Sequence, residues 1–400
     1  MTRKETPSGQ GIAQRCASRL LDIVVRIRTS EAREKMPRFL RTCGYRLLPK
    51  RRLARKMWQA QYDRVMQNVR PVPLRTSVTL GIIKDFMMKY ANYEAACLEL
   101  GVPYRLIDIA GDRWIDTVQS SGCDAFLAWP TNLSSVVKKL FDERLRILVE
   151  DMGKLLFPSL KALWLYESKA RQSQWLAAHR VRHPRTWVFA QREEALDFAC
   201  RAELPLVFKT DLGSAAAGVE IVRTRRRAEQ LVRICFGRGY LAHRHDPRDP
   251  HWGTVIFQHY IPNAREWRTI RIGDSYFGHR KLIRGDFHSG SRLAGWERPP
   301  DGLLDLLHGV TEMGPFLSMD ADVFEAADGV YYVNELQSMF GSVDPAQMYV
   351  DGRPGRFVRS QSGAWRFEQG YFCRNGSCNL RVIAVLSLLG APLSSEAQEE

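Results

Sequence analysis

Three side chains near the end of the sequence carry the oxygen atoms that a divalent cation needs. Asp322 is followed 13 residues later by Glu335, and Gln337 lies two positions beyond it. The residues between them alternate in polarity and contain Asp328-Gly329, a dipeptide that favours a hairpin turn. Two strands joined by that turn would bring the three side chains together. Magnesium is held by one or two carboxylates plus substrate phosphates, so the pattern predicts half of a nucleotide site.

A lysine beside a loop of small residues, earlier in the chain, could supply the other half. An apolar run ends on Lys209, and an alternating stretch that begins at Val219 reads as a second strand. The loop between them contains Gly213, Ser214 and Gly218. Small residues let backbone N–H groups approach phosphate oxygens, and the lysine adds a point charge. Such loops also close ordinary hairpins, so for this segment alone both interpretations stand.

Two further strands are predicted between these halves. Residues 255–261 form the first, which Pro262 ends, and an alternating stretch from Glu266 leads to a turn at Gly273-Asp274. This places the parts in a fixed order: a lysine with a small-residue loop, two strands, and then a pair of acids.

That order resembles the ATP-grasp superfamily, from about Ser77 to about Phe372. The resemblance implies an α+β fold, namely an ATP-grasp fold with a preceding α/β domain, and it implies ATP and Mg²⁺ as cofactors, with Mn²⁺ as an alternative. The implied nucleotide contacts are Lys169, Lys209, Gly213, Ser214 and Gly218 at the phosphates, Gln258 and Ile261 at the adenine, and Glu266 at the ribose. The resemblance also implies that Lys169 opens a helix. The implied metal ligands are Asp322, Glu335 and Gln337.

Two positions depart from the pattern of the superfamily. Gln337 stands where the superfamily has asparagine, which keeps a carbonyl oxygen but extends its reach by one methylene. Asp320 stands where some members have arginine, which leaves open the cation that stabilises the reacting phosphoryl group. Basic residues on the predicted central sheet could neutralise phosphate and carboxylate oxygens in its place. The candidates for this catalytic role are Arg268, Lys281 and Arg292.

The preceding residues alternate between strand and helix patterns, which predicts a parallel α/β unit. Strands are expected over residues 77–83, 104–109 and 123–129, with helices over 86–100 and 134–147. The predicted domains are a basic helical N-terminal extension (1–75), an α/β domain (76–165), the ATP-grasp domain (166–372) and a C-terminal tail (373–400).

Positive charge is concentrated at the start of the chain. Residues 1–70 contain 18 Lys and Arg against 5 Asp and Glu, and so account for +13 of the net charge of +15. This segment could contact an anionic membrane surface or a polyanion, or it could be a solvated helical extension. No specific nucleic acid is predicted as a partner. The acids within the segment weaken a transit-peptide interpretation.

The remaining composition favours a cytoplasmic protein, with peripheral attachment at the inner membrane face as the alternative. The 8 cysteines form no C-x-x-C pair, which indicates reduced thiols, and the longest apolar run, 382–391, is too short to span a bilayer.

The resemblance implies a ligase that uses ATP to activate a small-molecule or peptide carboxylate as an acyl phosphate, which an amine then captures. One alternative is a phosphotransferase built on the same site. Another is a nucleotide-regulated module that binds a polyanion or a membrane. His279 and His288 could serve as general bases, although this chemistry does not require one.

Overall fold

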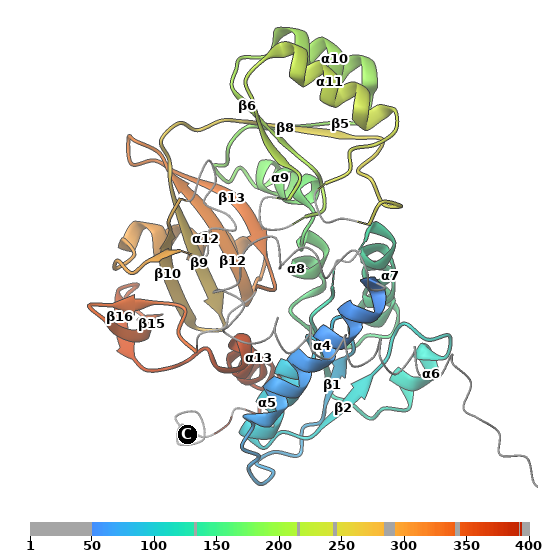
Figure 1. Ribbon diagram of the computed structural model, residues 1–400. Coiled ribbons are helices and arrows are strands. Elements are labelled where there is room, and N and C mark those ends of the chain that lie inside the picture. The colour runs from blue at the N-terminus through green and yellow to red at the C-terminus, as the bar shows by residue number, and fades with distance from the viewer. Residues whose placement is uncertain are drawn as a thin grey trace, which may run out of the picture.

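The computed structural model describes residues 50–131, 134–213, 217–242, 246–283, 293–340, 345–391 and 393. The strands of this part of the chain form three sheets (Figure 1). One is parallel, one is antiparallel, and the largest is an antiparallel sheet at the centre of the predicted site. The mixed helix and strand content confirms the predicted α+β class. The domain boundaries stay predictions.

The first sheet is parallel and confirms the predicted α/β unit. Its central strands are fully buried, as expected when helices cover both faces of a parallel sheet. Its strands, in spatial order, are β2 (Tyr104–Ile107), β1 (Leu80–Ile83), β3 (Ala125–Ala128) and β4 (Leu155–Phe157). Its helices are α5 (Ala91–Leu100), α6 (Trp114–Gln119) and α7 (Ser135–Arg146), which continues as a π-helix (Ile147–Asp151).

Helix α5 begins later than the sequence pattern predicts. The carboxylate of Asp85 accepts hydrogen bonds from the backbone N–H groups of Met87 and Tyr90. Met88 between them has a positive φ of 57°, which a helix does not allow. A turn therefore replaces the first helical turn that is expected from residue 86.

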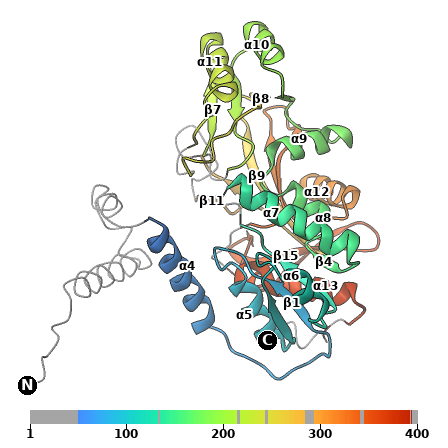
Figure 2. The same cartoon turned by 90° about the vertical axis from the view of Figure 1, so that its right-hand side faces the viewer.

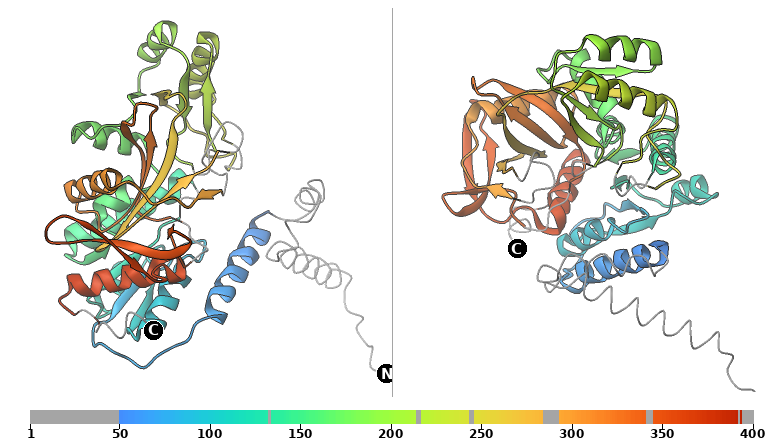
Figure 3. Two further views of the ribbon diagram at one scale, coloured as in Figure 1. Left: turned by 90° about the vertical axis from the view of Figure 1, so that its left-hand side faces the viewer. Right: turned by 45° about the horizontal axis from the view of Figure 1, so that its top comes forward.

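The segment expected to be a C-terminal tail is mostly a buried helix, α13 (Arg374–Leu388). It lies between the first sheet and the large sheet (Figures 1 and 3) and contacts α5 and the large-sheet strand β9 (Arg265–Ile272). Its residues Val382, Val385 and Leu386 belong to the core of the first unit. The apolar run that is too short for a membrane span therefore supplies part of the packing face of this helix.

A small antiparallel sheet follows along the chain, with two helices on one face (Figure 2). Its core is aromatic, with Phe208 and Phe257 fully buried. Its strands, in spatial order, are β5 (Thr186–Phe189), β8 (Val255–His259), β6 (Leu206–Lys209) and β7 (Val219–Val222). The covering helices are α10 (Arg192–Arg201) and α11 (Arg225–Phe236). Two connecting helices precede the sheet, α8 (Leu160–Leu165) and α9 (Lys169–Ala178).

The large sheet has the order β13-β12-β9-β10-β15-β14, with β11 and β16 attached to β10 and β15. Helix α12 (Asp301–Met313) covers one face of β9 and β10, where Leu303, Leu304 and Leu307 are buried. The remaining strands are β10 (Ser275–Lys281), β11 (Ala294–Gly295), β12 (Ser318–Glu325), β13 (Tyr331–Gln337), β14 (Tyr349–Val350), β15 (Arg353–Arg359) and β16 (Trp365–Gln369).

Helix α4 (Lys50–Gln67) is the described part of the basic extension and stands at the edge of the molecule (Figure 2). It packs against α5 through Tyr62 and Tyr90, whose ring centroids are 5.8 Å apart. The part of the prediction that concerns residues 1–49 lies outside the described residues. Within the described ranges, no helix combines the length and the apolar character needed to cross a membrane.

Candidate nucleotide and metal site

Four charged or ionisable side chains form a row across the large sheet. His279 is paired with Arg268, Arg268 with Asp322, and Asp322 with Glu335 on successive strands. Residues directly opposite each other on neighbouring strands point to the same face. Arg271, on the other face of β9, contacts Thr311 of α12, so the row lies on the face opposite α12. The predicted hairpin places Asp322 beside Glu335 as expected.

A β-bulge sits next to the paired acids. Asp322 pairs with Glu335, but Val323 pairs with Val333, so Asn334 is the extra residue on β13. Bulges re-aim side chains and are common beside functional sites. Here Asn334 Oδ1 accepts a hydrogen bond of 2.9 Å from Lys209 Nζ. The bulge thus connects the large sheet to the last residue of β6 in the small sheet.

Lys209 is almost buried, with 8% of its surface exposed. Burial lowers the pKa of its ammonium group to about 8, and the nearby carboxylates, Glu335 first, oppose that shift. A buried lysine without a full counter-charge is an attractive partner for an anionic ligand.

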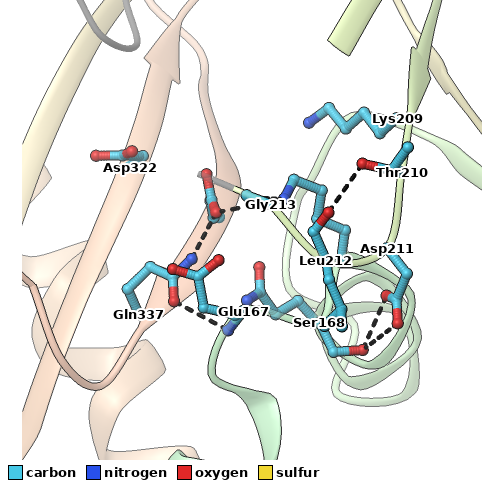
Figure 4. A network of polar contacts seen from close by, with 12 residues as sticks. Glu167, Ser168, Lys209, Thr210, Asp211, Leu212, Gly213, Asp322 and Gln337 are labelled. Atoms are coloured by element: carbon cyan, nitrogen blue, oxygen red, sulfur yellow. Dashed lines mark hydrogen bonds and ion pairs between the residues drawn. The ribbon is translucent and has the colours of Figure 1, made fainter. Parts of the chain in front are cut away.

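Lys169 is the first residue of α9, behind the N-cap Ser168, as predicted for a lysine that opens a helix. Its Nζ donates to the carbonyl oxygen of Gly213 at 2.5 Å and lies 3.9 Å from Glu335 Oε1. Figure 4 shows Lys209 and Gly213 on the small-sheet side, across from Asp322 and Gln337. Lys169 therefore connects the glycine of the loop to Glu335.

Gly218 has a conformational reason to be glycine. Its φ is +77°, and a Cβ atom built there would lie 2.1 Å from Thr210 Oγ1. The backbone of the loop can therefore close against the end of β6 only without a side chain. Ser214, the remaining predicted residue of the loop, lies outside the described residues.

The chemistry of the three proposed metal ligands suits Mg²⁺, but protein donors already engage them. Asp322 accepts hydrogen bonds from Arg268 Nε and Nη2 at 3.1 and 3.2 Å and from Lys281 Nζ at 2.7 Å. Glu335 Oε1 accepts from Gln337 Nε2 at 2.6 Å, and Gln337 Oε1 accepts from the backbone N–H of Glu167 at 3.1 Å. Within the described ranges, no three His, Cys, Asp or Glu side chains form a ready metal cluster.

Glu266 and Asp320 complete this charged network. Glu266 is buried, and its carboxylate accepts a hydrogen bond from Lys281 Nζ. The predicted contact of Glu266 with the ribose stays a prediction. Asp320 is 1% exposed, and its carboxylate lies 3.0 Å from Arg268 Nε. Burial raises the pKa of Asp320 well above its ordinary value, and Arg268 opposes that rise. Arg268 is therefore held between two aspartates.

A small pocket opens beside the lysines, between the small sheet and β13. Most of its lining is polar, and Leu176, Ile256 and Val333 are the apolar members. Gln258 lies in it and donates from Nε2 to Thr186 Oγ1 at 3.1 Å. The residues that line the pocket are Lys169, Ser173, Leu176, His183, Thr186, Lys209, Ile256, Gln258, Val333 and Asn334.

Comparison with known proteins first gives two negative results. No family model matches the sequence, and a search of curated proteins found no match. Solved structures do match the fold. N5-carboxyaminoimidazole ribonucleotide synthetase from Thermus thermophilus aligns with a TM-score of 0.52 at 14% identity, over 80% of this chain and 81% of that one. The chain has the ATP-grasp fold.

Two further ATP-grasp structures align less closely. A RimK domain protein from Sphaerobacter thermophilus gives a TM-score of 0.45 at 16% identity, over 65% of this chain and 90% of that one. The biotin carboxylase domain of Hydrogenobacter thermophilus 2-oxoglutarate carboxylase gives 0.49 at 15% identity over 67% of this chain, which spans 65% of that domain's chain. The alignment with the Thermus thermophilus structure confirms the predicted resemblance to the ATP-grasp superfamily at the level of the fold.

The ATP-grasp fold brings most of the predicted site residues together, although their roles stay predictions. Ile261 follows β8 and is not part of the pocket lining, and Arg292 lies outside the described residues. Sequence reasoning missed Thr186, His183 and Asn334. The available signal was that Asn334 directly precedes Glu335. A bulge depends on how two strands pair, so the residues of one strand do not predict it. The site residues that the structure gathers are Lys169, Lys209, Gly213, Gln258, Glu266, Arg268, Lys281, Asp322, Glu335 and Gln337.

Proposed function

We propose that this protein is an ATP- and Mg²⁺-dependent ligase that activates a carboxylate as an acyl phosphate for capture by an amine. One observation carries the proposal. Lys169 and Lys209, which flank the pocket, reach the acid-bearing end of β13, with Lys209 bonded to Asn334 and Lys169 3.9 Å from Glu335. A nucleotide with its base in the pocket would extend its phosphates toward these groups.

The residues of the site divide by role. Gln258 and the apolar lining would orient the base, while Lys169 and Lys209 would bind phosphate oxygens. Asp322, Glu335 and Gln337 offer the oxygen ligands that would hold Mg²⁺, which when bound supplies charge neutralisation between phosphates.

Arg268 and Lys281 lie on the same face and would neutralise phosphate and carboxylate oxygens. A carboxylate oxygen attacks the γ-phosphorus and ADP leaves, and the amine then attacks the acyl carbon and phosphate leaves. Each step depends on positioning and electrostatics, and no protein group forms a covalent intermediate.

The partners in this proposal are a small-molecule or peptide carboxylate and an amine acceptor. Helix α4 would present its basic side chains, such as Arg55, to an anionic surface or polyanion, and the expected location is the cytoplasm. The phosphotransferase alternative uses the same residues but delivers the phosphoryl group to a hydroxyl. Product analysis separates the two reactions, because only the ligase releases free phosphate with a condensed product.

The decisive experiment compares Glu335→Ala with Glu297→Ala, an exposed acid that pairs with Arg280 on the surface. Calorimetry should detect Mg²⁺-dependent binding of ATP to the natural protein and to Glu297→Ala. Glu335→Ala should lose Mg²⁺-dependent turnover in a screen of amino acids, peptides and sugar acids, while its circular dichroism stays unchanged. Unaltered turnover in Glu335→Ala would count against the proposal.

A further inference from the structure

Asp322, one of the three proposed metal ligands, is already bound to two protein cations. Lys281 Nζ lies 2.7 Å from Asp322 Oδ2, and Arg268 donates to both carboxylate oxygens. Lys281 also donates to Glu266, so its ammonium group is held between two carboxylates. These contacts place positive charge where the proposed function expects a divalent cation.

The two cations are firmly fixed in this position. The side chains of Lys281, Glu266 and Asp322 are 11%, 4% and 4% exposed. Little water surrounds the ion pairs, so their attraction is screened much less than that of surface pairs. Arg268 is fixed further because its Nε also lies 3.0 Å from Asp320.

The two cations offset the charge of Asp322 without a metal. Arg268 contacts Asp320 and Asp322, and Lys281 contacts Glu266 and Asp322. A divalent cation that arrives alone must push Lys281 and Arg268 away from Asp322 and leave both near its own charge. Such displacement of buried charges is costly, because the displaced groups lose their partner.

Nucleotide phosphates would remove that obstacle, because their oxygens offer Lys281 and Arg268 a new anionic partner. We infer that Lys281, with Arg268, keeps Asp322 occupied until phosphates bind, so that the divalent cation enters with the nucleotide and not before it. This inference rests on the proposed function and adds an order of binding to it. Lys281 is then a positioning residue that controls access to the metal ligand.

The test measures Mn²⁺ binding by electron paramagnetic resonance, with and without a non-hydrolysable ATP analogue. Lys281→Met keeps the aliphatic stem and removes the charge. Arg280→Met is the matched control, because Arg280 is the preceding residue of β10, points to the other face and pairs with Glu297. Lys281→Gln is a second variant in case the methionine variant does not fold.

We expect Mn²⁺ alone to bind the natural protein and Arg280→Met weakly, and to bind the Lys281 variants roughly tenfold more tightly. The analogue should strengthen Mn²⁺ binding to the natural protein much more than to the Lys281 variants. Equal Mn²⁺ affinity of the natural protein with and without the analogue would overturn the inference, as would Lys281 variants that match Arg280→Met. If neither the natural protein nor any variant binds the analogue, the proposed function fails. The comparison of Mn²⁺ affinities without the analogue still decides whether Lys281 hinders metal binding at Asp322.

Discussion

Lys209 Nζ donates a hydrogen bond of 2.9 Å to Asn334 Oδ1, which joins the end of a strand in the small sheet to the bulge of the large sheet. The two residues are 125 positions apart in the sequence. Each belongs to the pocket lining, so the contact marks the point where the two sheets would share one ligand. The first prediction concerns this lysine.

Nucleotide affinity should decrease as the pH rises through about 8. The pKa of Lys209 is lowered to about 8 by burial, so the free protein loses this positive charge above that pH. Phosphate oxygens bind the charged form, and Lys209→Met should therefore bind ATP weakly and without this pH dependence. Calorimetry across this pH range measures both effects. The control is Lys139→Met, which removes an exposed lysine and should keep the pH dependence of ATP affinity. A pH dependence of ATP affinity that persists in Lys209→Met would contradict the prediction.

His279 should make the protein less stable in acid. Burial lowers its pKa to about 4, whereas an unfolded histidine titrates near 6.5, so between these values the unfolded chain binds more protons. The free energy of unfolding should fall as the pH drops through this interval, by up to about 3 kcal/mol from this residue. His279→Gln should flatten that fall in urea titrations.

The control for this experiment is His259→Gln, because His259 is exposed. It should leave the acid-induced loss of stability unchanged. Identical pH profiles for His279→Gln and His259→Gln would show that His279 is not responsible for the effect.

The Gln258–Thr186 hydrogen bond should contribute to nucleotide affinity. Thr186→Val keeps the shape of the side chain but removes the hydroxyl that accepts from Gln258 Nε2 and donates to the carbonyl oxygen of Pro184. The Gln258 amide is then no longer held in one orientation, which should weaken ATP binding by roughly fivefold to tenfold. Thr117→Val, in the exposed helix α6, is the control for calorimetry. Equal affinities of the two variants would exclude a role for this pair.

Helix α13 should contribute strongly to stability. Leu386 is 0% exposed in the core of the first unit, whereas Leu388 on the same helix is 51% exposed. Leu386→Ala should lower the free energy of unfolding by about 2–4 kcal/mol, because it leaves a cavity. Leu388→Ala should change it by less than about 0.5 kcal/mol. Similar urea midpoints for the two variants would mean that the helix does not pack as described.

Local patterns are enough to predict the parts of the site. The Asp-Gly turn indicates the hairpin that brings Asp322 close to Glu335, although the bulge at Asn334 sets their final pairing. The end of an apolar run indicates that Lys209 closes a strand. Lys169 is expected to open a helix, and it does. These features depend on neighbours in the sequence, which is why a single sequence reveals them.

Features that depend on distant pairing cannot be read in this way. Arg268 and Lys281 are expected near phosphates, but their contact with Asp322 follows from the strand order β12-β9-β10, which no local pattern specifies. The bulge at Asn334 and the burial of Asp320 also depend on how strands distant in the sequence pair and pack. The pattern after residue 373 predicts only a tail, because the apolar face of this segment has no partner in its own neighbourhood.

The position of α13 has a consequence for biosynthesis. Its side chains complete the core around Leu80 and Tyr93, which leave the ribosome some 300 residues earlier. Until residue 388 has been synthesised, the apolar surface of the first unit that α13 covers stays exposed. Exposed apolar surface favours association with other nascent chains. The need for chaperones during translation should therefore depend on when α13 is synthesised and not on the order in which the sheets emerge.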